Sequence, residues 1–186
     1  MLDPSYLLDA CLISKVQRSG HLPKLLAACK KVSLGVIAEV HDELTRGDSE
    51  RAKQTKKLLD QGPVTVIELP LGSPAAEQLK KFRASKTTAN ADLGEHASIA
   101  YALHAQPVRF VTVDVGATFL MLSELGDRAV AYHWFLRELV EKNAISPRDA
   151  ADLSNGMLRE QSNVLEPSWW GAWLKAKQSG TSKRPK

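Results

Sequence analysis

Acidic side chains at the ends of expected strands and helices are the residues of this 186-residue chain whose placement points to chemistry. Asp9 ends the apolar run over residues 5–9, and Asp114 directly follows the buried run over residues 109–113. Further acids lie on expected helices, namely Glu39, Glu43, Asp92 and Glu95. Acids at the ends of elements, rather than along a solvated face, indicate a site.

Several carboxylates that converge in one crevice repel one another, because each raises the cost of ionising its neighbours. A hard divalent cation relieves that repulsion, and Mg²⁺ and Mn²⁺ prefer oxygen ligands. Such an ion acidifies a bound water and clamps the oxygens of an in-line phosphoryl displacement. The pattern is therefore typical of a site that cleaves a phosphodiester.

Each acid also has a plainer explanation. Asp9 is a residue type that often caps the turn after a strand. Glu39 and Glu43 lie four apart on one helix face, so one of them is expected to be solvated. Asp92 and Glu95 have the spacing of a capping box, in which both satisfy the amides of a helix start. Asp114 is the hardest to explain in this way, because it follows a buried strand.

Short apolar strands alternate with helices along the chain. Strands are expected at residues 5–9, 32–34, 64–69, 109–113 and 128–131. Helices are expected at residues 12–19, 22–31, 36–45, 49–61, 73–85, 94–104, 117–125 and 132–143, and from residue 146 onward. Because the strands are apolar on both faces, we expect an α/β fold, a three-layer α/β/α sandwich with a parallel sheet of four or five strands. Ligands of such sheets bind beyond the carboxyl ends of the strands, where Asp9 and Asp114 meet if their strands are neighbours.

The composition is that of an ordinary globular protein with a net charge of +4. Its lysines and arginines gather at residues 51–57, 80–86 and 175–186. That distribution is compatible with a polyanionic partner, and equally with solvated helix faces and a frayed terminus.

The cysteines and the apolar runs indicate the cellular compartment in which the protein is expected. Cys11 and Cys29 form no CxxC pair, and the five histidines lack the spacing of a zinc site. The N-terminus has no signal-peptide pattern, and no apolar run approaches the roughly 20 residues that span a bilayer. We expect a cytoplasmic protein without a membrane partner.

Four segments, taken in order, resemble the motifs of PIN-domain ribonucleases of the prokaryotic VapC-like toxin type: YLLDACLI, VSLGVIAEV, DLGEHASIAYAL and VTVDVGAT. The match runs from residue 5 to residue 145, where YHWFLRELVEKNAIS is similar to the C-terminal helix of that subgroup. The resemblance implies that Mg²⁺ or Mn²⁺ is held by four acids, which are Asp9, Glu39, Glu95 and Asp114. Glu43 and Asp92 are the alternate ligands. Thr112 takes a polar position of the fourth motif, from which it orients Asp114 or the attacking water.

The resemblance implies a metal-dependent endoribonuclease that hydrolyses RNA phosphodiester bonds, and in the toxin form one half of a toxin–antitoxin pair. A homodimer and an antitoxin protein that enters the acidic site are the partners it implies. The basic residues Lys80, Lys81, Arg83 and Lys86, together with the tail, are expected to bind the RNA backbone.

Three departures from the family pattern favour an alternative. Cys11 replaces the usual Asn, Val113 stands where many members have another Asp, and His96 follows Glu95 where a second carboxylate often occurs. A catalytically degenerate PIN-like domain, acting as an RNA-binding or protein-interaction module, is therefore the alternative. A phosphatase or receiver domain is disfavoured, because Asp9-Ala10-Cys11 lacks the DxD nucleophile pattern and no paired acids precede a phospho-accepting aspartate.

The chain is expected to divide into a PIN-like nuclease domain over residues 1–165 and a C-terminal extension over residues 166–186. The extension carries Trp169, Trp170 and Trp173, followed by a basic tail. Tryptophans in such a position are more typical of a core or an interface than of base stacking.

Overall fold

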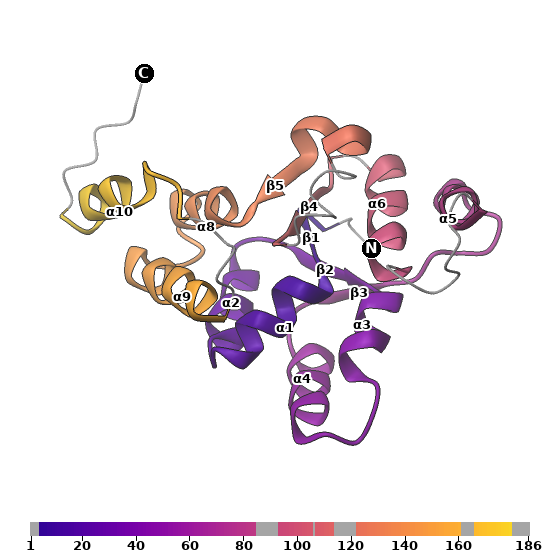
Figure 1. The fold of residues 1–186 in the computed structure, drawn as a ribbon, viewed down its shortest axis with the longest axis horizontal. Coiled ribbons are helices and arrows are strands. Elements are labelled where there is room, and N and C mark those ends of the chain that lie inside the picture. Colours follow the sequence, from indigo (N-terminus) through magenta and orange to yellow (C-terminus); the bar gives the residue numbers. More distant parts are fainter. Residues whose placement is uncertain (1–3, 85–92, 106, 114–121, 161–165, 180–186) are drawn as a thin grey trace.

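The structure is a computed structural model that describes residues 4–84, 93–105, 107–113, 122–160 and 166–179 (Figure 1). Its strands are β1 (Tyr6–Leu8), β2 (Leu34–Ile37), β3 (Thr65–Ile67), β4 (Arg109–Thr112) and β5 (Ala129–Ala131). Its helices are α1 (Ala10–Arg18), α2 (Leu22–Ala27), α3 (Ala38–Thr45), α4 (Glu50–Gln61), α5 (Pro74–Ala84), α6 (Leu93–His104), α8 (Tyr132–Glu141), α9 (Pro147–Glu160) and α10 (Trp170–Gln178). Short 3-10 helices at Ala28–Lys30 and Gly126–Arg128 complete the order.

All five strands are parallel, and their order in the sheet is β3-β2-β1-β4-β5. The expected parallel α/β/α sandwich is confirmed. β1 pairs with both β2 and β4, so the winding of the chain reverses between β1 and β4. That reversal is a topological switch point, where parallel sheets bind ligands at the carboxyl ends of their strands. The strands that precede Asp9 and Asp114 are therefore neighbours, as their predicted convergence requires.

Side chains of each strand alternate between two apolar clusters, one on each face of the sheet. Tyr6 and Leu8 of β1 belong to one cluster, with residues of α1, α2, α8, α9 and α10. Leu7 belongs to the other, with residues of α6. Figure 1 shows α5 and α6 to the right of the sheet and α8, α9 and α10 to its left. Because both faces are covered, the edge at the carboxyl ends of the strands is left for a site.

The second strand lies later in the chain than its pattern indicated. A strand at residues 32–34 and a helix from residue 36 were expected, but β2 spans Leu34–Ile37 and α3 begins at Ala38. The prediction was wrong because Gly35 interrupts the apolar run in the sequence without interrupting the strand. A Cβ on Gly35 would lie 2.8 Å from Pro4 Cγ, so the glycine allows the chain before β1 to lie against the sheet.

Serine side chains cap the starts of α4 and α5. Ser49 Oγ accepts a hydrogen bond from the Ala52 amide at 3.1 Å, which starts α4. Ser73 Oγ accepts one from the Ala76 amide at 3.2 Å, which starts α5. Each cap satisfies an amide that has no partner inside the helix. The expected helix over residues 22–31 is shorter than predicted, since α2 gives way to a 3-10 helix after Ala27.

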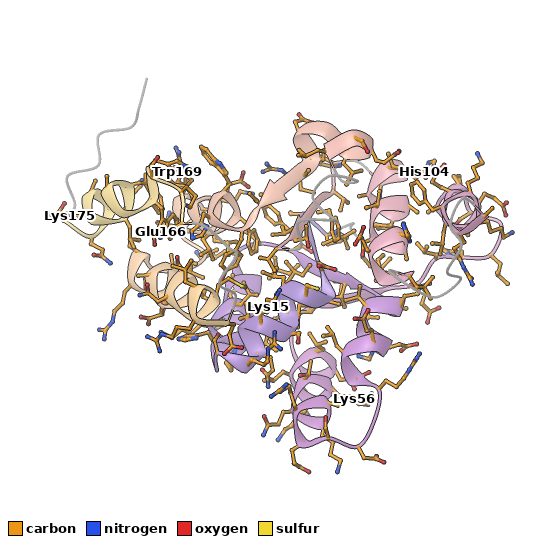
Figure 2. The ribbon with its side chains drawn as sticks, viewed as in Figure 1. Lys15, Lys56, His104, Glu166, Trp169 and Lys175 are labelled. Carbon is orange, nitrogen blue, oxygen red and sulfur yellow. The ribbon has the colours of Figure 1, made fainter. Side chains whose placement is uncertain are left out.

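The segment from residue 166 to residue 179 packs against the rest of the chain. Trp170 is 1% exposed and belongs to the same apolar cluster as β1 and α8. Figure 2 shows Trp169 and Glu166 at the end of the molecule that α8, α9 and α10 form. In the described part of the chain, no helix has the length and apolar character needed to cross a membrane.

Candidate active site

Asp9 is the best-defined member of the predicted site. It directly follows β1, precedes the first residue of α1, and is 4% exposed. Thr112, the last residue of β4, is 3% exposed and donates a hydrogen bond from Oγ1 to Asp9 Oδ2 at 2.6 Å. The pairing of Leu8 with Val111 explains this contact, because the next residue of each strand then lies side by side.

The plainer explanation for Asp9, a cap on the following turn, does not hold. Its side chain makes no capping hydrogen bond to α1, a helix that is described in full. The hydrogen bond from Thr112 instead fixes the carboxylate at the end of the strand. Such bonds to an ionised acceptor are short and roughly twice as strong as bonds between neutral groups. Thr112 therefore orients Asp9. Its predicted role toward Asp114 or the attacking water stays a prediction, because Asp114 lies outside the described residues.

Glu39 supplies a buried oxygen whose capacity to accept a hydrogen bond or a cation is unused. It lies in the first turn of α3, directly after β2, the strand beside β1. Among the buried side-chain nitrogens and oxygens of the described residues, Glu39 Oε2 alone has no hydrogen-bond partner. Leaving a buried acceptor without a partner costs about 1–3 kcal/mol, and more when the group is charged. A cation or donor that binds this oxygen removes that cost.

The starts of α3 and α6 lie against each other at Gly94. A Cβ on Gly94 would lie 2.8 Å from Val40 Cγ2 and 3.4 Å from Glu43 Oε2. Glu43 therefore reaches the first turn of α6, where the half-buried Glu95 follows Gly94. Glu43 itself is exposed, whereas Glu39 is half-buried, so the expectation that one acid of α3 is solvated is met. Three elements thus bring Asp9, Glu39, Glu43 and Glu95 to one edge of the sheet.

Three of the predicted site residues, Asp92, Asp114 and Lys86, lie outside the described residues. Within the ranges that are described, no three side chains of Asp, Glu, His or Cys are close enough to form a metal site. The donors that the structure does show fit Mg²⁺ or Mn²⁺ in kind. All are carboxylate oxygens, which hard cations prefer, and the oxygen of Glu39 still has a place for a ligand.

The three departures from the family pattern have structural consequences. Val113 is 8% exposed and packs in the apolar cluster. His96 is 2% exposed, and its ring lies 5.7 Å from that of Phe82, so it faces α5. Cys11 lines a cavity beside α3. These positions add no second carboxylate to the edge, whose acids come from β1, α3 and α6.

Two of the predicted RNA-binding residues lie close to the acidic edge. The contact between Phe82 and His96 joins the last turn of α5 to the first turn of α6. Lys81 and Arg83 flank Phe82 and are exposed. Lys80 forms an ion pair with Glu77 at 2.6 Å, so its charge is already balanced.

A small cavity of about 250 Å³ borders the acidic edge between α1 and α3. It is lined by Ala10, Cys11, Ser14, Lys15, Arg18, Glu43 and Leu44. Figure 2 shows Lys15 on α1, near the middle of the molecule. Sequence reasoning missed Lys15, although its signal is present. The polar residues of α1 recur at helical spacing on an otherwise apolar helix.

His133 lies shortly after a strand, but its side chain faces the interior. It follows β5 by two residues, is 3% exposed, and its Nε2 lies 3.0 Å from Ser154 Oγ. Burial lowers the pKa of His133 to about 4, so it is neutral at pH 7. Its ring packs at 5.1 Å from that of Trp170. His133 therefore belongs to the core and not to the acidic edge.

No protein-family model matches the chain, and neither the curated proteins nor the solved structures contain a match. The functional argument accordingly rests on the residues and on their geometry.

Proposed function

We propose that the protein is a divalent-metal-dependent endoribonuclease whose active site is the acidic edge of the sheet. One observation carries the proposal: the buried oxygen Glu39 Oε2 has no hydrogen-bond partner among the described residues, and it lies one strand away from the buried carboxylate of Asp9. Two carboxylates that follow neighbouring strands at the ligand-binding edge of a parallel sheet favour a positive ligand, which offsets their repulsion.

In this proposal Asp9, Glu39 and Glu95 hold Mg²⁺ or Mn²⁺ together with Asp114, which lies outside the described residues. Because no three described acids already lie close enough to form a metal site, binding of the ion has to draw these carboxylates together. Glu43 replaces one of them if the ion lies nearer to α6. When bound, the ion lowers the pKa of a water and neutralises charge on the phosphate under attack. The chain itself holds Asp9 in one orientation through Thr112, so the carboxylate does not reorganise as substrate binds.

RNA is the proposed substrate because the four motifs resemble those of PIN-domain ribonucleases. Lys81 and Arg83 support that choice, since exposed cations near the acidic edge attract the phosphates that the carboxylates would repel. Binding that depends on such contacts weakens as the salt concentration rises. The antitoxin and the homodimer stay predictions of the resemblance.

The direct test is cleavage of fluorescently labelled single-stranded RNA and transfer RNA with Mn²⁺, with Mg²⁺ and with EDTA. The Asp9→Asn and Glu39→Gln variants should lose at least about 100-fold in rate, a loss typical of removing one preorganised charge. Glu50→Gln is the matched control, because Glu50 opens α4 and its side chain is 83% exposed.

Binding of Mn²⁺, followed by electron paramagnetic resonance without RNA, gives a readout that does not depend on turnover. Glu39→Gln should weaken it, and Glu50→Gln should not. Equal cleavage by the wild type and both site variants would exclude the proposed enzyme. RNA binding without cleavage would instead support the catalytically degenerate PIN-like module.

A further inference from the structure

The polar face of α1 forms one wall of the cavity beside the acidic edge. The spacing of four residues of α1 places them on one side of the helix, because residues three and four positions apart are neighbours on its surface. These residues are Cys11, Ser14, Lys15 and Arg18. The opposite side of α1 is buried in the core through Leu12, Ile13 and Val16. The helix is thereby fixed in rotation, and its polar face points at the cavity.

Lys15 is the cation of this cavity that no side chain of the described segments neutralises. It is half-buried, and among the described residues it forms neither an ion pair nor a side-chain hydrogen bond. Arg18, one turn further along, is held by Glu160 at 3.2 Å. A charged group that has lost part of its water without gaining a partner is costly, so the site around Lys15 favours an anion.

We propose that Lys15, with the hydroxyl of Ser14, binds an RNA phosphate next to the one that is cleaved. This inference rests on the proposed function and adds a substrate-binding subsite to it. Lys15 lies on α1, six positions after Asp9, the residue that directly precedes the helix; this separation corresponds to about 9 Å of axial rise. A strand whose reacting phosphate lies at Asp9 then passes a neighbouring phosphate along α1.

The cavity fits this ligand in size and in charge. Its volume of about 250 Å³ is below the range of about 300–1,000 Å³ typical of pockets for whole small molecules. It holds a phosphate group with some water, since one water fills about 30 Å³. Glu43 on the facing wall repels an anion, which directs the phosphate toward Lys15.

The test measures RNA affinity and cleavage separately. Affinity is followed by fluorescence anisotropy of labelled single-stranded RNA, with Asp9→Asn in every variant so that no RNA is cut. Lys15→Ala should raise the Kd about tenfold, the loss of one charge-assisted contact. It should also reduce the slope of log K against log salt by about 0.7, the value for one single-strand phosphate. Lys15→Arg should keep most of the affinity.

Lys56→Ala is the matched control, because Lys56 lies on α4, away from α1 (Figure 2), and pairs with Asp60 at 2.8 Å. In chains that retain Asp9, Lys15→Ala should raise KM about tenfold and leave kcat within about twofold, since Lys15 does not touch the reacting phosphate. An unchanged Kd and salt slope for Lys15→Ala, in a protein that still cleaves RNA, would overturn the subsite and leave the nuclease intact. If the wild type neither bound nor cleaved RNA, the proposed subsite and the proposed nuclease function would both be overturned.

Discussion

The hydrogen bond between Thr112 and Asp9 joins the ends of two neighbouring strands through their side chains. Both residues are almost fully buried, so water does not compete for the carboxylate. The bond is the reason that Asp9 is aimed at the edge and does not cap α1. At the scale of single residues, activity should therefore depend on the hydroxyl of Thr112.

Thr112→Val should lower kcat/KM for RNA cleavage by about tenfold to 100-fold, because a hydrogen bond to a charged group contributes about 1.5–3 kcal/mol. Thr112→Ser keeps the hydroxyl and should retain most of the activity. Steady-state kinetics with Mn²⁺ measures both variants. Similar rates for the valine and serine variants would show that the bond has no part in catalysis.

Burial of His133 makes the stability of the protein depend on pH. Its folded pKa of about 4 lies below the usual value of about 6.5, so below pH 6.5 the unfolded chain binds a proton that the folded chain excludes. The free energy of unfolding should therefore fall as the pH drops from 6.5 toward 4, by about 3 kcal/mol from this residue.

Urea unfolding at pH 7 and at pH 4.5 checks this dependence. His133→Gln, which keeps a polar group near Ser154, should be less stable at pH 7 but should lose less stability on acidification. His104→Gln replaces an exposed histidine and should behave like the wild type. An equal loss of stability in all three proteins would assign the acid sensitivity to other groups.

At the scale of elements, the contact between α3 and α6 determines how close the acids of the two helices come. Gly94 permits it, because any side chain at this position would collide with Val40. Helix propensity alone favours alanine over glycine by about 1 kcal/mol, so the glycine is retained here against local preference. Its function in the fold is to bring Glu43 and Glu95 together.

Gly94→Ala should separate the starts of α3 and α6 and reduce RNA cleavage about tenfold, as small displacements of catalytic groups do. It should also fail to raise the melting temperature, although propensity alone predicts a gain. Adding Val40→Ala removes the colliding methyl group and should restore part of the activity. Full activity in the single variant would mean that the spacing of these helices does not matter.

At the scale of the whole molecule, the four tryptophans of the chain gather where α8 and α10 meet. Trp170 is buried, whereas Trp134 is 45% exposed. Arg137 lies 4.9 Å from the centre of the Trp134 ring and also contacts Trp169 and Trp173. The C-terminal helix is thereby bound to the helices that cover β4 and β5.

Trp170→Ala should lower the free energy of unfolding by about 3–5 kcal/mol, the cost of emptying a large core site. Trp134→Ala, in the same cluster, should cost about 1 kcal/mol through lost ring and cation contacts. Urea unfolding followed by tryptophan fluorescence and by circular dichroism measures both. If α10 is part of one cooperative unit, the two signals of the wild type coincide. A small effect of Trp170→Ala would show that α10 folds independently.

Much of the fold follows from local patterns in the sequence. Short apolar runs between helices predict the parallel sheet, and Asp9 is recognisable because it ends such a run. The serine caps at Ser49 and Ser73 are equally local, since each side chain bonds an amide three residues away. These features depend on neighbours in the chain, so periodicity and residue type suffice to find them.

Other features depend on residues that are distant in sequence, and only the tertiary structure decided them. The bounds of β2 depend on Pro4 lying against Gly35, and the orientation of Asp9 depends on Thr112, which is 103 positions away. Within the described parts of the chain, the Glu39 oxygen has no hydrogen-bond partner and the Lys15 cation has no anion, and neither fact is visible in a pattern of residue types. A sequence shows which groups can bind, whereas the packed chain decides which of them have already found a partner.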